Sequence, residues 1–183
     1  PQEIIDAVDS KTAIVTLIHV NNETGAVLDI KTLCDKIKEK NKRTVIHIDA
    51  TQSFMKLPFD VSKIQCDSMA FSGHKIYAPK GIGLFYKKKN VKCKKLLHGN
   101  KDEFHPGTPA LPLIVSFAKA LRISLHELDK KVDIVTKWNE KVIKNISKFE
   151  GIKINNSKYC IPHIINISLM DIKPEYANIK EGK

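Results

Sequence analysis

Several features that commonly define a protein class are missing from this chain. No run of about 18 or more apolar residues occurs, so a membrane-spanning helix is not expected. The amino terminus lacks the basic and apolar regions of a secretory signal peptide, and it also lacks an initiator Met. We therefore expect a protein without a membrane partner, and a sequence cut from a longer polypeptide.

Arginine is scarce although the chain is strongly basic. The formal net charge is +11, yet Arg occurs only as Arg43 and Arg122, and the remaining cations are Lys. The abundance of Lys, Ile and Asn is typical of an AT-rich coding sequence, and proteins that read bases and phosphates usually rely on Arg forks. We therefore expect no nucleic-acid partner and interpret the Lys-rich cluster at residues 87–95 as a solvated surface.

Paired cysteine motifs are also absent. Cys34, Cys66, Cys93 and Cys160 are scattered singly, and no two have the C-x-x-C spacing that indicates a metal site. Isolated cysteines in a domain of this size are typical of a reducing compartment. The sequence therefore predicts no metal centre and a cytoplasmic location.

Hydrophobic patterning predicts an α/β fold for the first part of the chain. Short apolar, β-branched runs predict four strands, at residues 13–18, 44–48, 68–71 and 82–86. Apolar residues at helical spacing over 30–37 predict a helix, with Asp29 as its cap. Strands that alternate with a helix favour a mostly parallel sheet.

The pattern changes after residue 109. Apolar residues then recur every three or four positions over roughly residues 110–148, which predicts one long helix or two in line. Two later runs, residues 151–154 and 164–169, predict strands of a second, smaller unit. We therefore divide the chain into residues 1–109 and 110–183.

Polar side chains with complementary chemistry follow two of the predicted strands. Asp49 ends one apolar run and Lys75 lies just beyond the next, so parallel strands would bring both to one sheet edge. Pyridoxal phosphate enzymes need a carboxylate for the pyridine nitrogen and a lysine for the Schiff base. Ser72 and His74 could donate to the phosphate, and Gln52 to the phenolic oxygen. Taken singly, Asp49 would more often be a strand-end cap and Lys75 a solvated side chain in a turn, and only their combination with Gln52 favours the cofactor site.

Three blocks of the sequence closely resemble NifS-type cysteine desulfurases. They are residues 19–25 (HVNNETG), 47–53 (HIDATQS) and 71–83 (FSGHKIYAPKGIG). The order and spacing of the blocks also match, and the resemblance runs from about residue 4 to about residue 170. The resemblance implies the class V aminotransferase fold of the PLP-transferase type (fold type I). Residues 1–109 would form the second half of the cofactor-binding large domain. Residues 110–183 would form a linking helix and an incomplete small domain.

The resemblance also implies a role for each matching residue. Lys75 would be the Schiff-base lysine, and Asp49 and Gln52 would contact the pyridine nitrogen and the phenolic oxygen. Ser72 and His74 would be phosphate ligands, Gly73 between them would also belong to the cofactor site, and Thr108 would be lent to the phosphate of the neighbouring subunit. Asn22 would lie beside the phenolic oxygen and the substrate carboxylate. In contrast to these residues, Asp67 is expected to start a strand, so Asp49→Ala should impair the intact enzyme far more than Asp67→Ala.

The implied activity converts L-cysteine to L-alanine and transfers sulfur as an enzyme persulfide, for iron–sulfur cluster or thio-cofactor assembly. The implied partners are a sulfur-acceptor or scaffold protein and a second subunit in a homodimer. The loop at residues 97–108 departs from the family because it lacks two expected arginines. One phosphate-binding threonine, a ring-stacking histidine and the persulfide cysteine fall outside the chain, so we expect it to be inactive alone. The alternatives are a selenocysteine lyase and a degenerate, non-catalytic binding homologue.

Overall fold

The computed structural model describes residues 1–94 and 106–170, which include a four-stranded sheet in the order β1-β2-β3-β4. The strands are β1 (Ile14–Ile18), β2 (Val45–Asp49), β3 (Ser68–Ser72) and β4 (Gly83–Lys87). The first three are parallel and β4 is antiparallel to β3, which confirms the predicted mostly parallel α/β sheet. The connection from β3 to β4 is shorter than the roughly a dozen residues that a parallel crossover needs, so β4 returns antiparallel.

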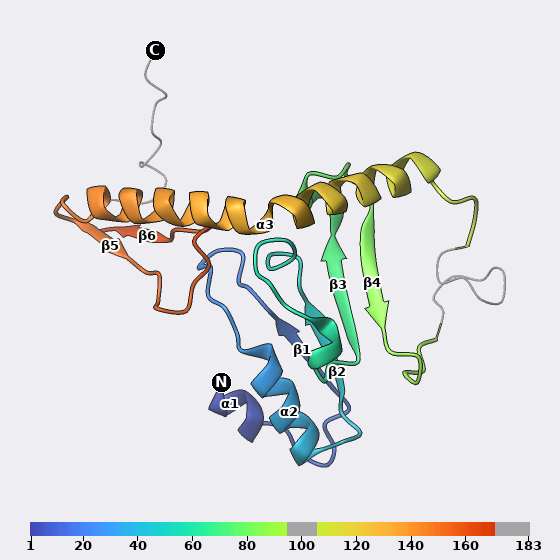
Figure 1. Ribbon diagram of the computed structural model, residues 1–183. Helices are drawn as coiled ribbons and strands as arrows, with labels where there is room; N and C mark the ends of the chain where they lie inside the picture. Colours follow the sequence, from blue (N-terminus) through green and yellow to red (C-terminus); the bar gives the residue numbers. More distant parts are fainter. Residues whose placement is uncertain (95–105, 171–183) are drawn as a thin grey trace.

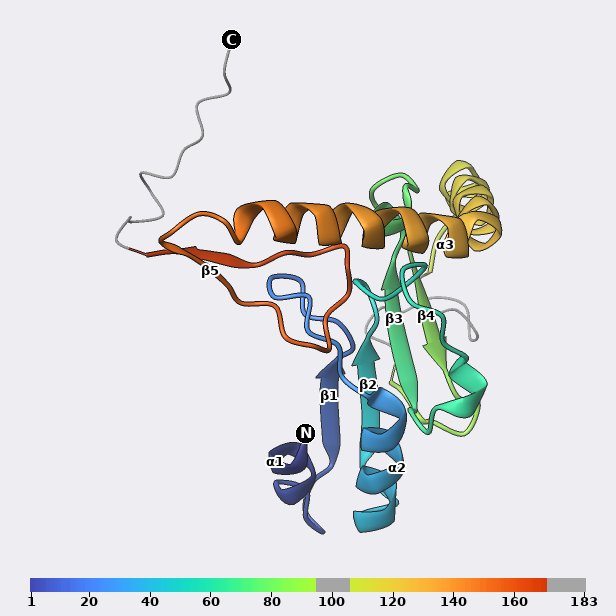
Figure 2. The ribbon, with the colours of Figure 1, turned by 60° about the vertical axis from the view of Figure 1, so that its left-hand side comes forward.

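One short helix precedes β1, a second helix follows it, and a long helix follows the sheet (Figure 1). The first two are α1 (Gln2–Asp6) and α2 (Ile30–Lys40), which lie side by side near the start of β1 and β2 (Figure 2). Helix α3 (Leu111–Ile146) is continuous and lies across the carboxyl end of β3 (Figure 1). A two-stranded antiparallel sheet, β5 (Ile152–Ile154) with β6 (Ile167–Leu169), follows it.

Helix α2 forms as its sequence predicts. Its apolar positions Ile30, Leu33, Cys34 and Ile37 are all buried. Asp29 caps the helix, because its carboxylate accepts hydrogen bonds from the backbone N–H of Thr32 at 3.1 Å and from the Thr32 hydroxyl at 2.6 Å. The helix therefore presents one apolar face, which packs into the core.

The two faces of the main sheet differ in burial. One face carries Leu17, Ile48 and Met69, which belong to the hydrophobic core. On the other face, Ile14 and Phe85 expose 60% and 50% of their surface. Because strand side chains alternate between faces, Asp49 and Ser72 lie on this second, more open face.

Asp67 lies directly before β3 (Ser68–Ser72), close to its expected position, and it also makes long-range contacts that the sequence did not predict. It is buried, and its Oδ2 atom lies 2.6 Å from Lys38 Nζ of α2. The same oxygen accepts a hydrogen bond from the backbone N–H of Ile46 at 2.8 Å. Lys38 also donates to the Thr44 carbonyl oxygen at 2.8 Å. Asp67 therefore joins α2 and the beginnings of β2 and β3.

The segment after α3 packs against the loop that follows β1. The backbone N–H of Val27 donates to the Tyr159 carbonyl at 2.8 Å, and that of Ile161 donates to the Gly25 carbonyl at 2.9 Å. These bonds join parts of the chain that are far apart in sequence. Within residues 1–94 and 106–170, no helix is both long and apolar enough to cross a membrane.

Candidate functional site

The carboxyl ends of β1, β2 and β3 meet at one edge of the sheet. In the register of the sheet, Ile18 pairs with Asp49 and Asp49 pairs with Ala70. The 3-10 turn η2 (Gly73–Ile76), which contains Lys75, follows β3 directly at this edge. The loop with the exposed Asn22 follows β1 at the same edge. The strand arrangement therefore brings Asn22, Asp49 and Lys75 to one edge, as the sequence predicts.

Asp49 is half-buried and points to the open face of the sheet. Its Oδ1 atom accepts a hydrogen bond from the backbone N–H of Thr51 at 2.8 Å. Its direct neighbour in β3 on this face is small, because Ala70 pairs with Asp49, and Phe85 of β4 follows Ala70 in the same row. The small Ala70 side chain leaves room beside the Asp49 carboxylate.

Ser72 and His74 form a hydrogen-bonded pair at the end of β3. The Ser72 hydroxyl lies 2.8 Å from His74 Nδ1. Gly73 between them is buried, and a Cβ atom there would lie 2.8 Å from the Ile82 carbonyl oxygen. Close packing therefore requires glycine at position 73. The tight turn at Gly73 lies between Ser72 and His74, whose hydroxyl and imidazole groups are next to each other.

The amide of Gln52 is oriented by a lysine that the sequence interpretation overlooked. Lys56 Nζ donates to Gln52 Oε1 at 2.7 Å, which leaves the Gln52 Nε2 group to act as a donor elsewhere. Burial, and then the charge of Lys75, lowers the pKa of Lys56. The available sequence signal was the spacing of four residues between Gln52 and Lys56.

Lys75 lines a small cavity of ≈150 Å³ beneath α3. Other residues of its lining include Lys56, Lys131 and His163, which come from three separate parts of the chain. Asp49 does not line this cavity, so the predicted covalent reach of Lys75 to the Asp49 site stays a prediction. Among the described residues, Lys75 forms no hydrogen bond or ion pair.

Thr108 is exposed and lies just before α3. Most of the loop that departs from the family, residues 97–105, lies outside the described residues. The structure therefore gives Thr108 a position, and it shows no side-chain hydrogen bond of Thr108 within residues 1–94 and 106–170.

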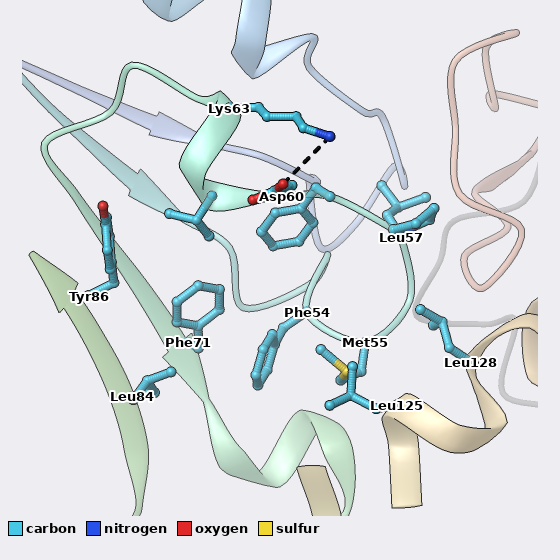
Figure 3. Close-up of a pocket in the computed structure, with 13 residues that line it drawn as sticks. Phe54, Met55, Leu57, Asp60, Lys63, Phe71, Leu84, Tyr86, Leu125 and Leu128 are labelled. Atoms are coloured by element: carbon cyan, nitrogen blue, oxygen red, sulfur yellow. Dashed lines mark ion pairs between the residues drawn. The ribbon is translucent and has the colours of Figure 1, made fainter. Parts of the chain in front are cut away.

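A large apolar groove lies away from these residues. Its volume is ≈670 Å³, and its walls come from the turn after β2, from β3 and β4, and from α3 (Figure 3). Phe54, Phe71 and Leu84 are among the side chains that line it, with the Asp60–Lys63 ion pair of 3.6 Å as its polar part (Figure 3). None of the predicted site residues lines this groove.

Two of the four cysteines are unsuited to react at neutral pH. Cys34 and Cys66 are buried, and burial raises the pKa of the Cys34 thiol to about 12. Burial also raises the pKa of the Cys66 thiol. Cys93 is exposed, and Cys160 is half-buried. Across the described residues, no group of three or more His, Cys, Asp or Glu side chains is placed to hold a metal ion.

Comparison with known proteins identifies the class of this chain. The family model for aminotransferase class-V matches residues 1–179, so the chain belongs to this family. The cysteine desulfurase IscS of Pectobacterium atrosepticum is 34% identical over 178 residues, which cover 94% of this chain and 44% of that protein. The protein of the same name from Escherichia coli O139:H28 is also 34% identical, and the match covers 95% of this chain and 44% of that protein.

Solved structures agree with this assignment. A NifS-like protein superimposes with a TM-score of 0.90 at 31% identity, covering 96% of this chain and 48% of the other. SspA in complex with cysteine superimposes with a TM-score of 0.75 at 30% identity, covering 92% of this chain and 47% of the other. The chain thus spans about half the length of the relatives that it matches.

Proposed function

We propose that this chain forms the lysine-bearing part of a pyridoxal phosphate-dependent cysteine desulfurase. One observation carries the proposal: three groups lie at the same edge of the sheet, where the parallel strands β2 and β3 end. These groups are Asp49, the Ser72–His74 pair and the turn that contains Lys75. The likeness to proteins named cysteine desulfurase supports the choice of reaction.

The residues at this edge fit the cofactor chemically. Asp49 uses one carboxylate oxygen for the Thr51 N–H, and the described residues place no hydrogen bond on the other, so it can accept from the pyridine N–H. Ser72 and His74 are 2.8 Å apart and can donate to the same phosphate. Gln52 has its oxygen engaged by Lys56 and can donate through Nε2 to the phenolic oxygen.

When bound, pyridoxal phosphate supplies an electron sink for negative charge at the substrate Cα. Asp49 would hold the proton on the pyridine nitrogen, which keeps that sink effective. The ε-amine of Lys75 would hold the aldehyde carbon of the cofactor, and the same amine could move the proton at the substrate Cα. Asn22 would contact the substrate carboxylate, and Thr108 would reach the phosphate of the neighbouring subunit.

The intact enzyme would act as a cytoplasmic homodimer. It would convert L-cysteine to L-alanine, with the sulfur held as a persulfide for transfer to an acceptor or scaffold protein. Within this chain, residues 1–109 would belong to the cofactor-binding domain and residues 110–183 to the linking helix and small domain. Because Cys34 and Cys66 are buried with raised thiol pKa values, they are poor sulfur acceptors.

The test is covalent trapping of the cofactor. The chain is incubated with pyridoxal phosphate, its visible absorption is recorded, and borohydride then fixes the adduct for peptide mass spectrometry. We expect the label on Lys75, and its loss in Lys75→Met. Lys80→Met is the matched control, because Lys80 is exposed and lies only five positions further along.

Spread of the label over surface lysines, without preference for Lys75, would refute the cofactor assignment. For the intact enzyme, a second assay measures alanine and sulfide from cysteine, or selenide from selenocysteine, and thereby separates desulfurase from lyase activity. We expect no turnover from this chain alone. Turnover abolished by substitution of Cys93 or Cys160 would show that the sulfur acceptor lies in this chain.

A further inference from the structure

The loop that follows β1 carries Asn22 on a short turn. Asn21 Oδ1 accepts hydrogen bonds from the backbone N–H groups of Glu23 at 3.0 Å and Thr24 at 2.9 Å. Asn22 is exposed, and its side chain forms no hydrogen bond within the part of the chain that the structure describes. The direction of the Asn22 amide therefore depends on how the backbone of this turn is held.

The segment after α3 holds three consecutive carbonyl groups of this turn (Figure 2). The carbonyl oxygens of Glu23, Thr24 and Gly25 each accept a hydrogen bond from residues 156–166, at 3.3, 3.1 and 2.9 Å respectively. The donors follow their acceptors by 132 to 143 positions in the sequence. The turn with Asn22 is therefore fixed by a part of the chain that lies beyond the long helix.

The side chain of Asn156 is the centre of this contact. Its Nδ2 group donates to the Thr24 carbonyl at 3.1 Å and to the Ile164 carbonyl at 2.8 Å. Its Oδ1 atom accepts from the backbone N–H of Asn166 at 2.7 Å. Both amide hydrogens are thus engaged, one towards the turn and one within the segment. Asn156 therefore fixes the Thr24 carbonyl relative to the segment after α3.

The two segments are also closely packed. Gly25 is buried with a φ of +73°, and a Cβ atom there would lie 3.0 Å from Ile164 Cβ. Ile161, whose backbone N–H donates to the Gly25 carbonyl, is only 1% exposed. The turn therefore has little room to shift while the hydrogen bonds of Asn156 are in place.

We propose that Asn156 is a positioning residue that sets the direction of Asn22 through the Thr24 carbonyl. The inference rests on the proposed function, in which Asn22 contacts the substrate carboxylate beside the phenolic oxygen of the cofactor. The hydrogen bonds of Asn156 go to Thr24, Ile164 and Asn166, and to none of the candidate site residues. The segment after α3 thereby influences the site without contributing a reacting group to it.

The first measurement is amide hydrogen exchange, residue by residue, in the full chain without cofactor. In Asn156→Ala we expect the N–H groups of Thr24 and Gly25 to exchange about tenfold faster, because loss of a hydrogen bond makes local opening easier. The rates in α2 should rise less, because the hydrogen bonds of Asn156 do not involve this helix. An equal increase in the turn and in α2 would mean a general loss of stability and would overturn the proposal.

Asn139→Ala is the matched control. Asn139 Nδ2 of α3 donates to the Pro162 carbonyl at 2.9 Å, so this substitution also removes an asparagine amide that is bonded to the same segment. It leaves the bonds to the turn in place, and the exchange rates of the turn should stay close to those of the unmodified chain. Rates in the turn that rise as much as in Asn156→Ala would contradict a specific role of Asn156.

Asn156→Asp tests the donor separately from the acceptor. The carboxylate keeps an oxygen for the Asn166 N–H, but it places a second oxygen where Nδ2 donated to two carbonyl groups. We expect the turn to exchange at least as fast as in Asn156→Ala. Exchange as slow as in the unmodified chain would show that the bond to Thr24 does not hold the turn.

The second measurement uses the adduct of pyridoxal phosphate with Lys75 and does not depend on turnover. Its visible absorption is titrated with pH. A donor beside the phenolic oxygen stabilises negative charge there, so Asn22→Ala should raise the midpoint, and Asn156→Ala should raise it by a similar or smaller amount. The double variant should titrate like Asn22→Ala, because Asn156 acts through Asn22. Asn139→Ala should titrate like the unmodified chain.

Additive shifts in the double variant would overturn the proposal, since Asn156 would then act independently of Asn22. An unchanged midpoint in Asn156→Ala would do the same. Failure of the unmodified chain to form an adduct at Lys75 would refute the proposed function instead, and the exchange comparison then decides by itself whether Asn156 holds the turn.

Discussion

Asp67→Ala should cause the largest loss of stability among single carboxylate substitutions outside the candidate site. The side chains of Lys38 and Asp67 are only 17% and 10% exposed, and their charged atoms are 2.6 Å apart. The substitution leaves the Lys38 ammonium without its acid and the Ile46 N–H without its acceptor. Removing one partner of a buried pair typically costs about 3–5 kcal/mol, a large part of the roughly 5–15 kcal/mol that stabilises a domain.

The assay is urea unfolding followed by far-ultraviolet circular dichroism. Asp133→Ala is the matched control, because Asp133 pairs with Lys137 at 2.7 Å but the two side chains are 61% and 71% exposed. The control should unfold at nearly the same urea concentration as the unmodified chain, because exposed pairs contribute little. Added salt should change the effect of Asp67→Ala only slightly, because salt screens buried pairs poorly.

A double-mutant cycle tests the cause of the loss. In Lys38→Met with Asp67→Ala, no uncompensated charge remains, so the double variant should lose less free energy of unfolding than the two single variants together. Additive losses, or equal losses in Asp67→Ala and Asp133→Ala, would refute the reasoning. This result also matters for activity assays, since Asp67→Ala would reduce activity through folding and is therefore no neutral control for Asp49→Ala.

Three further outcomes follow from local packing and burial. Gly73→Ala should reduce the free energy of unfolding by about 1–3 kcal/mol, because the new Cβ would lie 2.8 Å from a carbonyl oxygen. A lower melting temperature would show this loss. Burial lowers the pKa of His19 from 6.5 to about 4, so stability that is fully present above pH 6.5 should be lost as pH falls towards 4, on the order of 3 kcal/mol. His19→Gln should flatten this dependence in urea titrations, whereas the exposed His126→Gln should not. Iodoacetamide should label Cys93 in the folded chain and the buried Cys34 only after unfolding, as peptide mapping would show.

Local sequence patterns determined most of the elements. Helix α2 could be predicted because its four apolar positions and its Asp29 cap lie within one short stretch, where backbone hydrogen bonds join near neighbours. The strands could be predicted because each β-branched run lies within one short stretch, although their backbone hydrogen bonds join residues that are far apart in the sequence. The common edge of Asp49 and Lys75 followed from one further step, because parallel strands place their carboxyl ends together.

Only the tertiary structure decided which polar groups meet across long separations. The carboxylate of Asp67 depends on Lys38, which is 29 positions earlier, and no local pattern records that contact. The cavity at Lys75 likewise needs Lys131 of α3 and His163 of the following segment. Such contacts depend on the path of the whole chain. A Lys, Asp or His residue can equally well lie on the surface, so the residue type alone does not show which partner it meets. The sequence by itself therefore determined the elements and their order, whereas the partners of Asp67 and Lys75 were decided by how those elements pack.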